Sequence, residues 1–270
     1  MASTAFPETT SSGTHEVVRR WTPDGPTRAT VVICHGLGEH SGRYEHTGDL
    51  LAEAGLAVVA YDQVGFGGSG GRRAWVDQWS DVLDQIQRHV QEAKATGMPA
   101  ILFGCSNGGL FALEYTISER PTPDLLVMSA PALGGGAAWQ RRVSEIVDRV
   151  FPKARIPNNF KSDQLSRDPA VGDAYFEDPL NVFATTVHYG TELFRAMDRV
   201  RREATRLTVP TLVLHGASDT IVPPQSTAFL ADLPGVERRV FPALRHELLN
   251  EPEGPEIIRD VVTWIDRHLS

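Results

Sequence analysis

The chain of 270 residues is 41% hydrophobic and 22% charged, so it holds enough apolar residues to bury one large core. Its formal net charge of −8, with no run of Lys and Arg mixed with aromatic residues, argues against nucleic acid as a partner. The two cysteines, Cys34 and Cys105, lie in or beside apolar runs, which is typical of small buried side chains rather than of a disulfide framework.

Residues 1–14 are rich in Ser, Thr and Pro, and they lack the basic start and the apolar stretch of a signal peptide. No part of the sequence approaches the run of about 18 apolar residues that a membrane span needs. We therefore expect residues 1–14 to form a disordered tail and the protein to be cytoplasmic.

Strands and helices alternate over residues 15–133, the first part of the expected core. The unbroken β-branched run at 29–34 is typical of a strand buried on both faces in a parallel sheet. Further strands are expected at residues 15–22, 57–61, 99–103 and 125–129, with helices before residue 54, over residues 76–95 and from residue 109. This order predicts an α/β fold with a mostly parallel, doubly wound sheet.

Gly65, Gly67 and Gly70 match the dinucleotide-binding fingerprint as a string. Three residues separate them from the preceding strand, however, and residues 71–74 delay the next helix. Because the fingerprint needs strand, turn and helix in immediate succession, we expect no nicotinamide or flavin cofactor.

The alternation stops at residue 134, and residues 134–206 read as an inserted helical cap. An apolar stripe along its first helix is formed by Trp139, Val143, Ile146, Val147 and Val150. We expect about half of this stripe to pack within the cap and the exposed part to form a rim on which lipid aggregates land. The core resumes over residues 207–270, with strands at 211–215 and 236–241 and a closing helix at 255–269.

Ser106 lies at the centre of the pattern Gly-x-Ser-x-Gly, between an apolar strand and a helix. A tight turn in this position forces the serine outward at the end of the sheet, and it requires glycine at positions 104 and 108. Ser106 is therefore the expected nucleophile.

Asp219 and His246 are the expected acid and base. Each follows a predicted strand, at the sheet edge where Ser106 emerges, and the order serine, acid, histidine is that of the α/β-hydrolase fold. Asp62 is the rival acid, but it precedes the serine and is expected to hold the glycine loop. The other histidines considered, for which a turn or a helix end is explanation enough, are His35, His215 and His268.

Residues 246–250 are similar to the His-Glu-x-x-His motif, whose two histidines bind zinc in metalloproteases. Asn250 stands where the second histidine would be, so no metal is expected. Two backbone N–H groups are expected to form an oxyanion hole, that of Asn107 after the nucleophile and that of Leu37 after the first buried strand. Cys105 is expected to point into the sheet as a packing residue.

A family resemblance rests on residues 35–44, the serine turn, residues 165–169 and 178–180, His215-Gly216 with Asp219, and residues 246–252. These stretches resemble the monoacylglycerol lipases of the α/β-hydrolase superfamily, of the serine aminopeptidase S33 type. The resemblance implies a cytoplasmic or membrane-surface enzyme that splits monoacylglycerol into fatty acid and glycerol, with an apolar tunnel under the cap. It also implies that Glu39, Arg43 and Tyr175 lie near the glycerol end.

The sequence departs from the family pattern beside the nucleophile, where Cys105 and Asn107 replace His and Met, and at residues 181–184. These departures affect the expected acyl and alcohol preference rather than catalysis. A carboxylesterase or lysophospholipase acting on another single-chain ester is the alternative enzyme. A hydrolase-fold lipid-binding protein without chemistry is the alternative of another class, although such a protein has no need of a base beside a serine.

Overall fold

The structure is a computed structural model that describes residues 3–9, 13–136 and 138–269. Its main sheet has eight strands in the order β1-β2-β4-β3-β5-β6-β9-β10, and the pairs from β4 to β10 are parallel. The strands are β1 (Thr4–Thr9), β2 (His15–Trp21), β3 (Ala29–Cys34), β4 (Leu56–Tyr61), β5 (Ala100–Cys105), β6 (Leu125–Ser129), β9 (Thr211–Gly216) and β10 (Val236–Phe241). The predicted parallel, doubly wound α/β sheet is thus observed.

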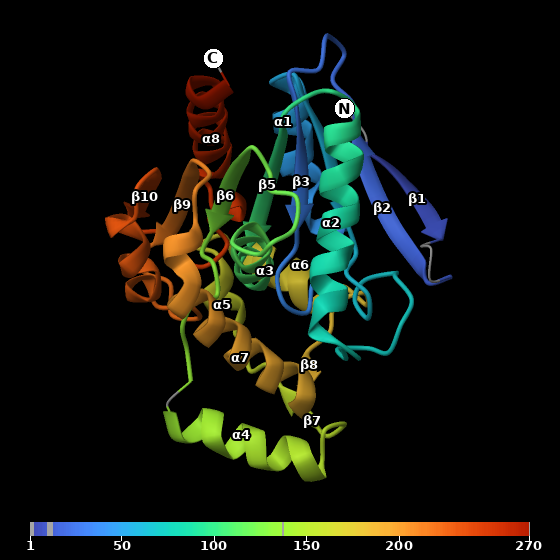
Figure 1. Ribbon diagram of the computed structural model, residues 1–270, viewed down its shortest axis with the longest axis vertical. Helices are drawn as coiled ribbons and strands as arrows, with labels where there is room; N and C mark the ends of the chain where they lie inside the picture. Colours follow the sequence, from blue (N-terminus) through green and yellow to red (C-terminus); the bar gives the residue numbers. More distant parts are fainter. Residues whose placement is uncertain (1–2, 10–12, 137, 270) are drawn as a thin grey trace.

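Helices cover both faces of the sheet (Figure 1), and an apolar layer lies between the sheet and the helices on each face. Successive residues of β3 alternate between the two layers: Val32 lies in the layer with α2 (Trp79–Ala95) and α3 (Asn107–Thr116), whereas Val31 and Ile33 lie in the layer with α1 (Glu45–Glu53) and α8 (Gly254–Leu269). A strand that is buried on both faces can be apolar at every position. This explains the unbroken apolar run in the sequence.

The insertion between β6 and β9 contains α4 (Ala138–Val150), β7 (Arg155–Pro157), α5 (Ser162–Leu165), α6 (Pro169–Glu177), β8 (Ala184–Thr186) and α7 (Val187–Glu203). Its last helix belongs to the core, because Tyr189, Ala196 and Val200 of α7 are buried in the same layer as α2 and α3. Arg199 also donates to Glu114 of α3 at 2.7 Å. Figure 1 shows α4 at the far end of the molecule from both termini, beyond α7.

Residues 4–9 differ from the expected disordered tail, because they form β1 and pair antiparallel with β2 over six residues. β2 would otherwise leave its backbone groups unpaired at the edge of the sheet, and an added strand satisfies them. Glu8 of β1 also accepts from Arg20 of β2 at 2.6 Å. The prediction failed because it weighed composition and not the free edge.

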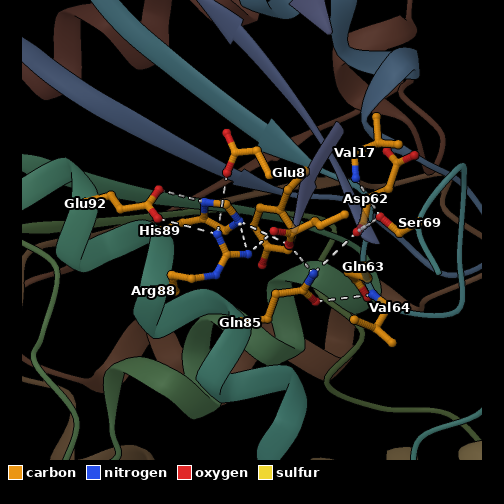
Figure 2. Close-up of polar contacts among 12 residues, drawn as sticks. Glu8, Val17, Asp62, Gln63, Val64, Ser69, Gln85, Arg88, His89 and Glu92 are labelled. Carbon is orange, nitrogen blue, oxygen red and sulfur yellow. Dashed lines mark hydrogen bonds and ion pairs between the residues drawn. The ribbon is translucent and has the colours of Figure 1, made fainter. Parts of the chain in front are cut away.

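A cluster of hydrogen-bonded and ion-paired side chains connects β2 to α2 (Figure 2). Glu16 of β2 is fully buried and contacts Gln85, Arg88 and His89 of α2. Gln85 in turn donates to the backbone carbonyl of Asp62 at 3.4 Å, so the cluster reaches the loop that follows β4. A buried carboxylate is tolerated because several donors satisfy it.

Short 3-10 helices complete the chain: η1 (Ser41–Tyr44), η2 (Ala204–Arg206), η3 (Pro224–Asp232) and η4 (Leu248–Asn250). Among the helices that the structure describes, none is both long and apolar enough to cross a bilayer.

Candidate active site

Ser106 sits in a sharp turn between β5 and α3, with φ 51° and ψ −116°. A side chain at Gly104 would collide with the backbone of Gly108, and one at Gly108 would collide with the backbone of Cys34. The two glycines thus let β5, α3 and β3 approach closely enough to hold the turn. A serine in this strained conformation is pushed out of the sheet at its carboxyl edge.

His246 and Asp219 reach Ser106 from two loops at the same edge. The Nε2 atom of His246 lies 2.9 Å from the Oγ of Ser106, and its Nδ1 atom lies 2.8 Å from the Oδ2 of Asp219. The other oxygen of Asp219 accepts from the backbone N–H groups of Ile221 and Val222, both at 2.9 Å. The structure therefore brings the three sequence-predicted residues together in hydrogen-bonded order.

The pKa of Asp219 is lowered and the pKa of His246 is raised. Burial would raise the pKa of Asp219, but hydrogen bonds from His215 and His246 hold it well below its usual range. Burial would lower the pKa of His246, but the hydrogen bond to Asp219 and the charges of Asp219, Glu247 and Glu39 raise it above 6.5. An ionised acid beside a basic imidazole is the arrangement that draws a proton from a serine hydroxyl.

The rival candidates have other partners. Asp62 accepts from Ser41 and from the N–H of Gly68 at 2.7 Å, so it holds the glycine loop as predicted. The Nε2 atom of His35 accepts from the backbone of Gln63 at 2.9 Å, and His268 contacts the carbonyl of Trp264. His215 differs from expectation, because it contacts Asp219 at 3.3 Å as well as supporting a turn.

The two residues whose backbone N–H groups are expected to form an oxyanion hole lie in different segments near the serine. Asn107 is the first residue of α3, where an N–H has no partner within its own helix. Leu37 follows β3 and lines the same pocket as Ser106. The Asn107 side chain is buried and donates to the hydroxyl of Tyr189 on α7 at 3.0 Å. The turn at Ser106 is thus hydrogen-bonded, through Asn107, to the last helix of the insertion.

A pocket lies above Ser106, with about 590 Å³ of space between its walls, part of it open to solvent. Its walls are largely apolar and come from both the core and the insertion: Leu37, Tyr44, Cys105, Phe160, Leu165, Tyr175, Ile221, Leu248 and Leu249. Cys105 packs against the apolar layer that holds Ile101 and Phe103, as expected of a packing residue, but it also lines this pocket, which was not expected. Burial raises the pKa of its thiol, which disfavours the reactive thiolate.

A buried ion cluster closes one side of the pocket. Arg43 donates to Glu39 at 2.6 Å and to both oxygens of Glu247 at 2.7 and 2.8 Å. Glu39 also accepts from the N–H of Gly36 at 2.6 Å and from the hydroxyl of Tyr44 at 2.7 Å. The cluster therefore joins the Leu37 loop to the residue after His246. Sequence reasoning missed Glu247, since only the fold brings it to Arg43.

Tyr175 completes this side of the pocket from α6. Its ring lies 4.8 Å from the guanidinium of Arg43, and its buried hydroxyl has no hydrogen-bond partner within the described part of the chain. Glu39 and Arg43 are satisfied by each other and by Glu247, whereas Tyr175 is not. Of the three residues that the resemblance placed at the glycerol end, only Tyr175 keeps a free polar atom.

The insertion also holds the loop that carries His246. The carbonyls of Gln164 and Leu165 accept from the N–H groups of His246 and Glu247, at 3.4 and 2.8 Å. The fully buried carboxylate of Glu251 accepts from the N–H groups of Arg167 and Arg245, at 2.9 and 2.7 Å. The base thus depends on residues 164–167 as well as on the core.

Comparison with known proteins gives a consistent result. A family model described as "Serine aminopeptidase, S33" matches residues 25–253. The chain is 33% identical to a monoacylglycerol lipase of Mycolicibacterium smegmatis, over 92% of each chain, and 30% identical to the monoglyceride lipase of Homo sapiens, over 96% of this chain and 88% of that one.

Solved structures agree. The crystal structure of the Paleococcus ferrophilus monoacylglycerol lipase matches with a TM-score of 0.84 at 31% identity, covering 93% of this chain and 98% of that one. A soluble variant of the Saccharomyces cerevisiae monoglyceride lipase, in complex with a substrate analog, matches with a TM-score of 0.90 at 20% identity, over 100% and 97% of the two chains. At that lower identity the likeness concerns the fold.

Proposed function

Because the chain belongs to the serine aminopeptidase S33 family of α/β-hydrolases, we propose that it hydrolyses carboxylic esters and that its substrate is a monoacylglycerol. The observation that carries the proposal is the chain of contacts from Ser106 to His246 to Asp219, at 2.9 and 2.8 Å, on the floor of a largely apolar pocket. Relatives that bear the name monoacylglycerol lipase support the choice of ester.

In the proposed mechanism His246 Nε2 takes the proton of Ser106 as Oγ bonds to the ester carbonyl carbon. The N–H groups of Leu37 and Asn107 hydrogen-bond to the negative oxygen that forms. The bond from carbon to the alcohol oxygen then breaks, and the alcohol leaves with the proton held by His246. A water molecule then bonds to the acyl carbon as His246 takes one of its protons. The bond from that carbon to Ser106 Oγ breaks, Ser106 takes the proton from His246, and the fatty acid leaves.

The apolar walls of the pocket fit the acyl chain, and the side lined by Glu39 and Tyr175, both of which contact Arg43, fits the alcohol. We assign the direct contact with glycerol to Tyr175, because its buried hydroxyl lacks a partner and an alcohol of the substrate would supply one. Glu39 and Arg43 then act by fixing the Leu37 loop. This differs from the roles that the resemblance implied for the three residues.

The outer face of α4 suits contact with a lipid surface. Trp139, Val143, Ile146 and Val150 are 67%, 47%, 58% and 63% exposed, and Phe151 is 63% exposed. The helix meets α7 through polar side chains instead: Ser144 with Thr191 at 2.5 Å, Asp148 with His188 at 3.1 Å, and Arg141 with Asp198. Four of the five residues of the apolar stripe are therefore exposed and Val147 is half-buried, so a smaller part of the stripe packs within the cap than the half expected.

A helix with its apolar side outward is typical of one that lies in a lipid interface. A substrate with a long acyl chain must leave such an interface to reach Ser106. We therefore infer that α4 contacts the membrane or micelle from which the substrate is drawn.

Labelling with a fluorophosphonate probe tests the chemistry. Wild-type protein should be labelled on Ser106, and Ser106→Ala should not. Ser106→Ala and His246→Ala should each lower kcat by about 10⁴ or more, because the three residues act as a unit. Circular dichroism should show both variants folded. Activity of either variant within about tenfold of wild type would contradict the assignment.

A further inference from the structure

His215 stands against the acid of the site. It lies near the end of β9, its side chain is 0% exposed, and its Nε2 atom is 2.9 Å from the carbonyl of Val222 and 3.3 Å from the Oδ2 of Asp219. A carbonyl oxygen can only accept, so the Nε2 atom of His215 must carry a proton. The proton is directed to Val222, and the atom that carries it lies beside the Oδ2 of Asp219.

The same carboxylate oxygen of Asp219 also receives His246, at 2.8 Å. We propose that His215 is a positioning residue. It holds the carboxylate of Asp219 in the orientation in which it bonds to His246, and it interacts with part of the negative charge that would otherwise act on His246 alone. The inference rests on the proposed function only in treating His246 as the base.

The groups around the two histidines determine the sign of the effect. The Nδ1 atom of His215 faces the hydroxyl of Thr227 at 3.3 Å, and that hydroxyl accepts from Arg238. His246 faces Asp219, Glu247 and Glu39, whose charges raise its pKa. Removing His215 leaves His246 as the one side chain of the described residues within hydrogen-bond distance of Asp219 Oδ2, so the charged form of His246 gains stability.

The test compares three substitutions of His215. His215→Leu and His215→Asn both remove the donor at the Nε2 position, whereas the longer amide of His215→Gln can restore it. In the first two variants we expect the acid limb of kcat/KM, measured on a soluble p-nitrophenyl ester, to move to higher pH by about one unit. In His215→Gln we expect the limb to stay near the wild-type position.

His89→Leu is the matched control, since it removes another fully buried histidine that does not line the pocket. It should lower the melting temperature and leave the acid limb in place. An unmoved limb in His215→Leu and His215→Asn, or an equal shift in His215→Gln, would overturn the proposal. If His215→Leu does not fold, the comparison of His215→Asn with His215→Gln still tests the proposal.

A second measurement needs no substrate. The proton between His246 and Asp219 should give a low-field NMR signal in wild type, and this signal should move in His215→Leu or His215→Asn but not in His89→Leu. If wild-type protein hydrolyses no ester, the proposed function fails while this signal still decides the role of His215. If hydrolysis depends on Ser106 but the signal and the acid limb do not move, only the role of His215 fails.

Discussion

His246 is the residue whose charge state decides whether Ser106 can react. It accepts the proton of Ser106 only when neutral, and its pKa is raised above 6.5 because the hydrogen bond and charge of Asp219, with Glu247 and Glu39, outweigh burial. Activity should therefore be lost as pH falls through a value above 6.5.

We predict that kcat/KM rises with pH along a limb centred above 6.5, and that Glu247→Gln moves the limb downward. The amide lacks the charge of Glu247, so the imidazolium loses a favourable interaction, and it keeps one of the two acceptor oxygens that face Arg43. The measurement is the pH dependence of kcat/KM on a soluble ester. A limb below 6.5 in wild type would contradict the expected environment of His246.

Glu39 and Tyr175 allow positioning to be separated from recognition. We predict that Glu39→Gln lowers turnover of monoacylglycerol and of a p-nitrophenyl ester of equal chain length by similar factors, about tenfold, because Glu39 holds the loop that carries Leu37. Tyr175→Phe should penalise monoacylglycerol alone. If Glu39→Gln instead spares the p-nitrophenyl ester, Glu39 recognises the alcohol directly.

At the level of single residues, sequence order could predict Ser106, Asp219 and His246 because each follows a strand at one edge of the sheet. It could not predict that His215 and Glu247 share their environment. Those contacts depend on how the loops after β9 and β10 turn, which no local pattern determines. Cys105 keeps the strand alternation with Ile101 and Phe103, but the sequence could not reveal that it also lines the pocket.

Among the elements, α4 offers the clearest test. We predict that Trp139→Ser and Ile146→Ser each weaken binding to liposomes by about tenfold and leave hydrolysis of a short soluble ester unchanged. Both side chains are exposed, so their loss should not disturb the core. Val240→Ser, an exposed apolar residue of β10, is the matched control and should bind liposomes as wild type does. Equal losses on lipid binding and soluble ester would point to a packing role instead.

Periodicity in the sequence revealed the stripe of α4 but not what the stripe faces. Helical spacing places Trp139, Val143 and Ile146 on one side, and a stripe of this kind usually turns inward. Here the side toward α7 is taken by polar pairs such as Ser144 with Thr191. The pairing of side chains 47 positions apart is a property of the fold, so the sequence alone could not reveal it.

For the whole molecule, the lining of the pocket above Ser106 favours a substrate with one acyl chain, because apolar walls face a side that is closed by the ion cluster of Glu39, Arg43 and Glu247. We predict that monoacylglycerol is turned over at least about tenfold faster than diacylglycerol or triacylglycerol of equal acyl length, a gap of about 1.4 kcal/mol in transition-state binding. The measurement is kcat/KM on dispersed substrates at matched surface concentration. Equal rates on triacylglycerol would describe a broad carboxylesterase, and preference for a lysophospholipid would favour the alternative enzyme.

The overall architecture was the most predictable level. Alternating strands and helices gave the parallel sheet, and the break at residue 134 marked the insertion. Two features escaped: β1, which pairs with a free edge, and α7, which lies within the insertion but is buried in the core. Both depend on contacts between segments distant in sequence, to which composition is insensitive.

The backbone of Ser106 has a consequence for how such a protein evolves. Its φ of 51° and ψ of −116° are a conformation that a residue other than glycine adopts at a cost of about 1–3 kcal/mol. Glycine at this position would relieve the strain, so selection for thermal stability alone would remove the serine. A lineage that keeps Ser106 must recover that free energy elsewhere, in its sheet and helices, before other destabilising changes can accumulate.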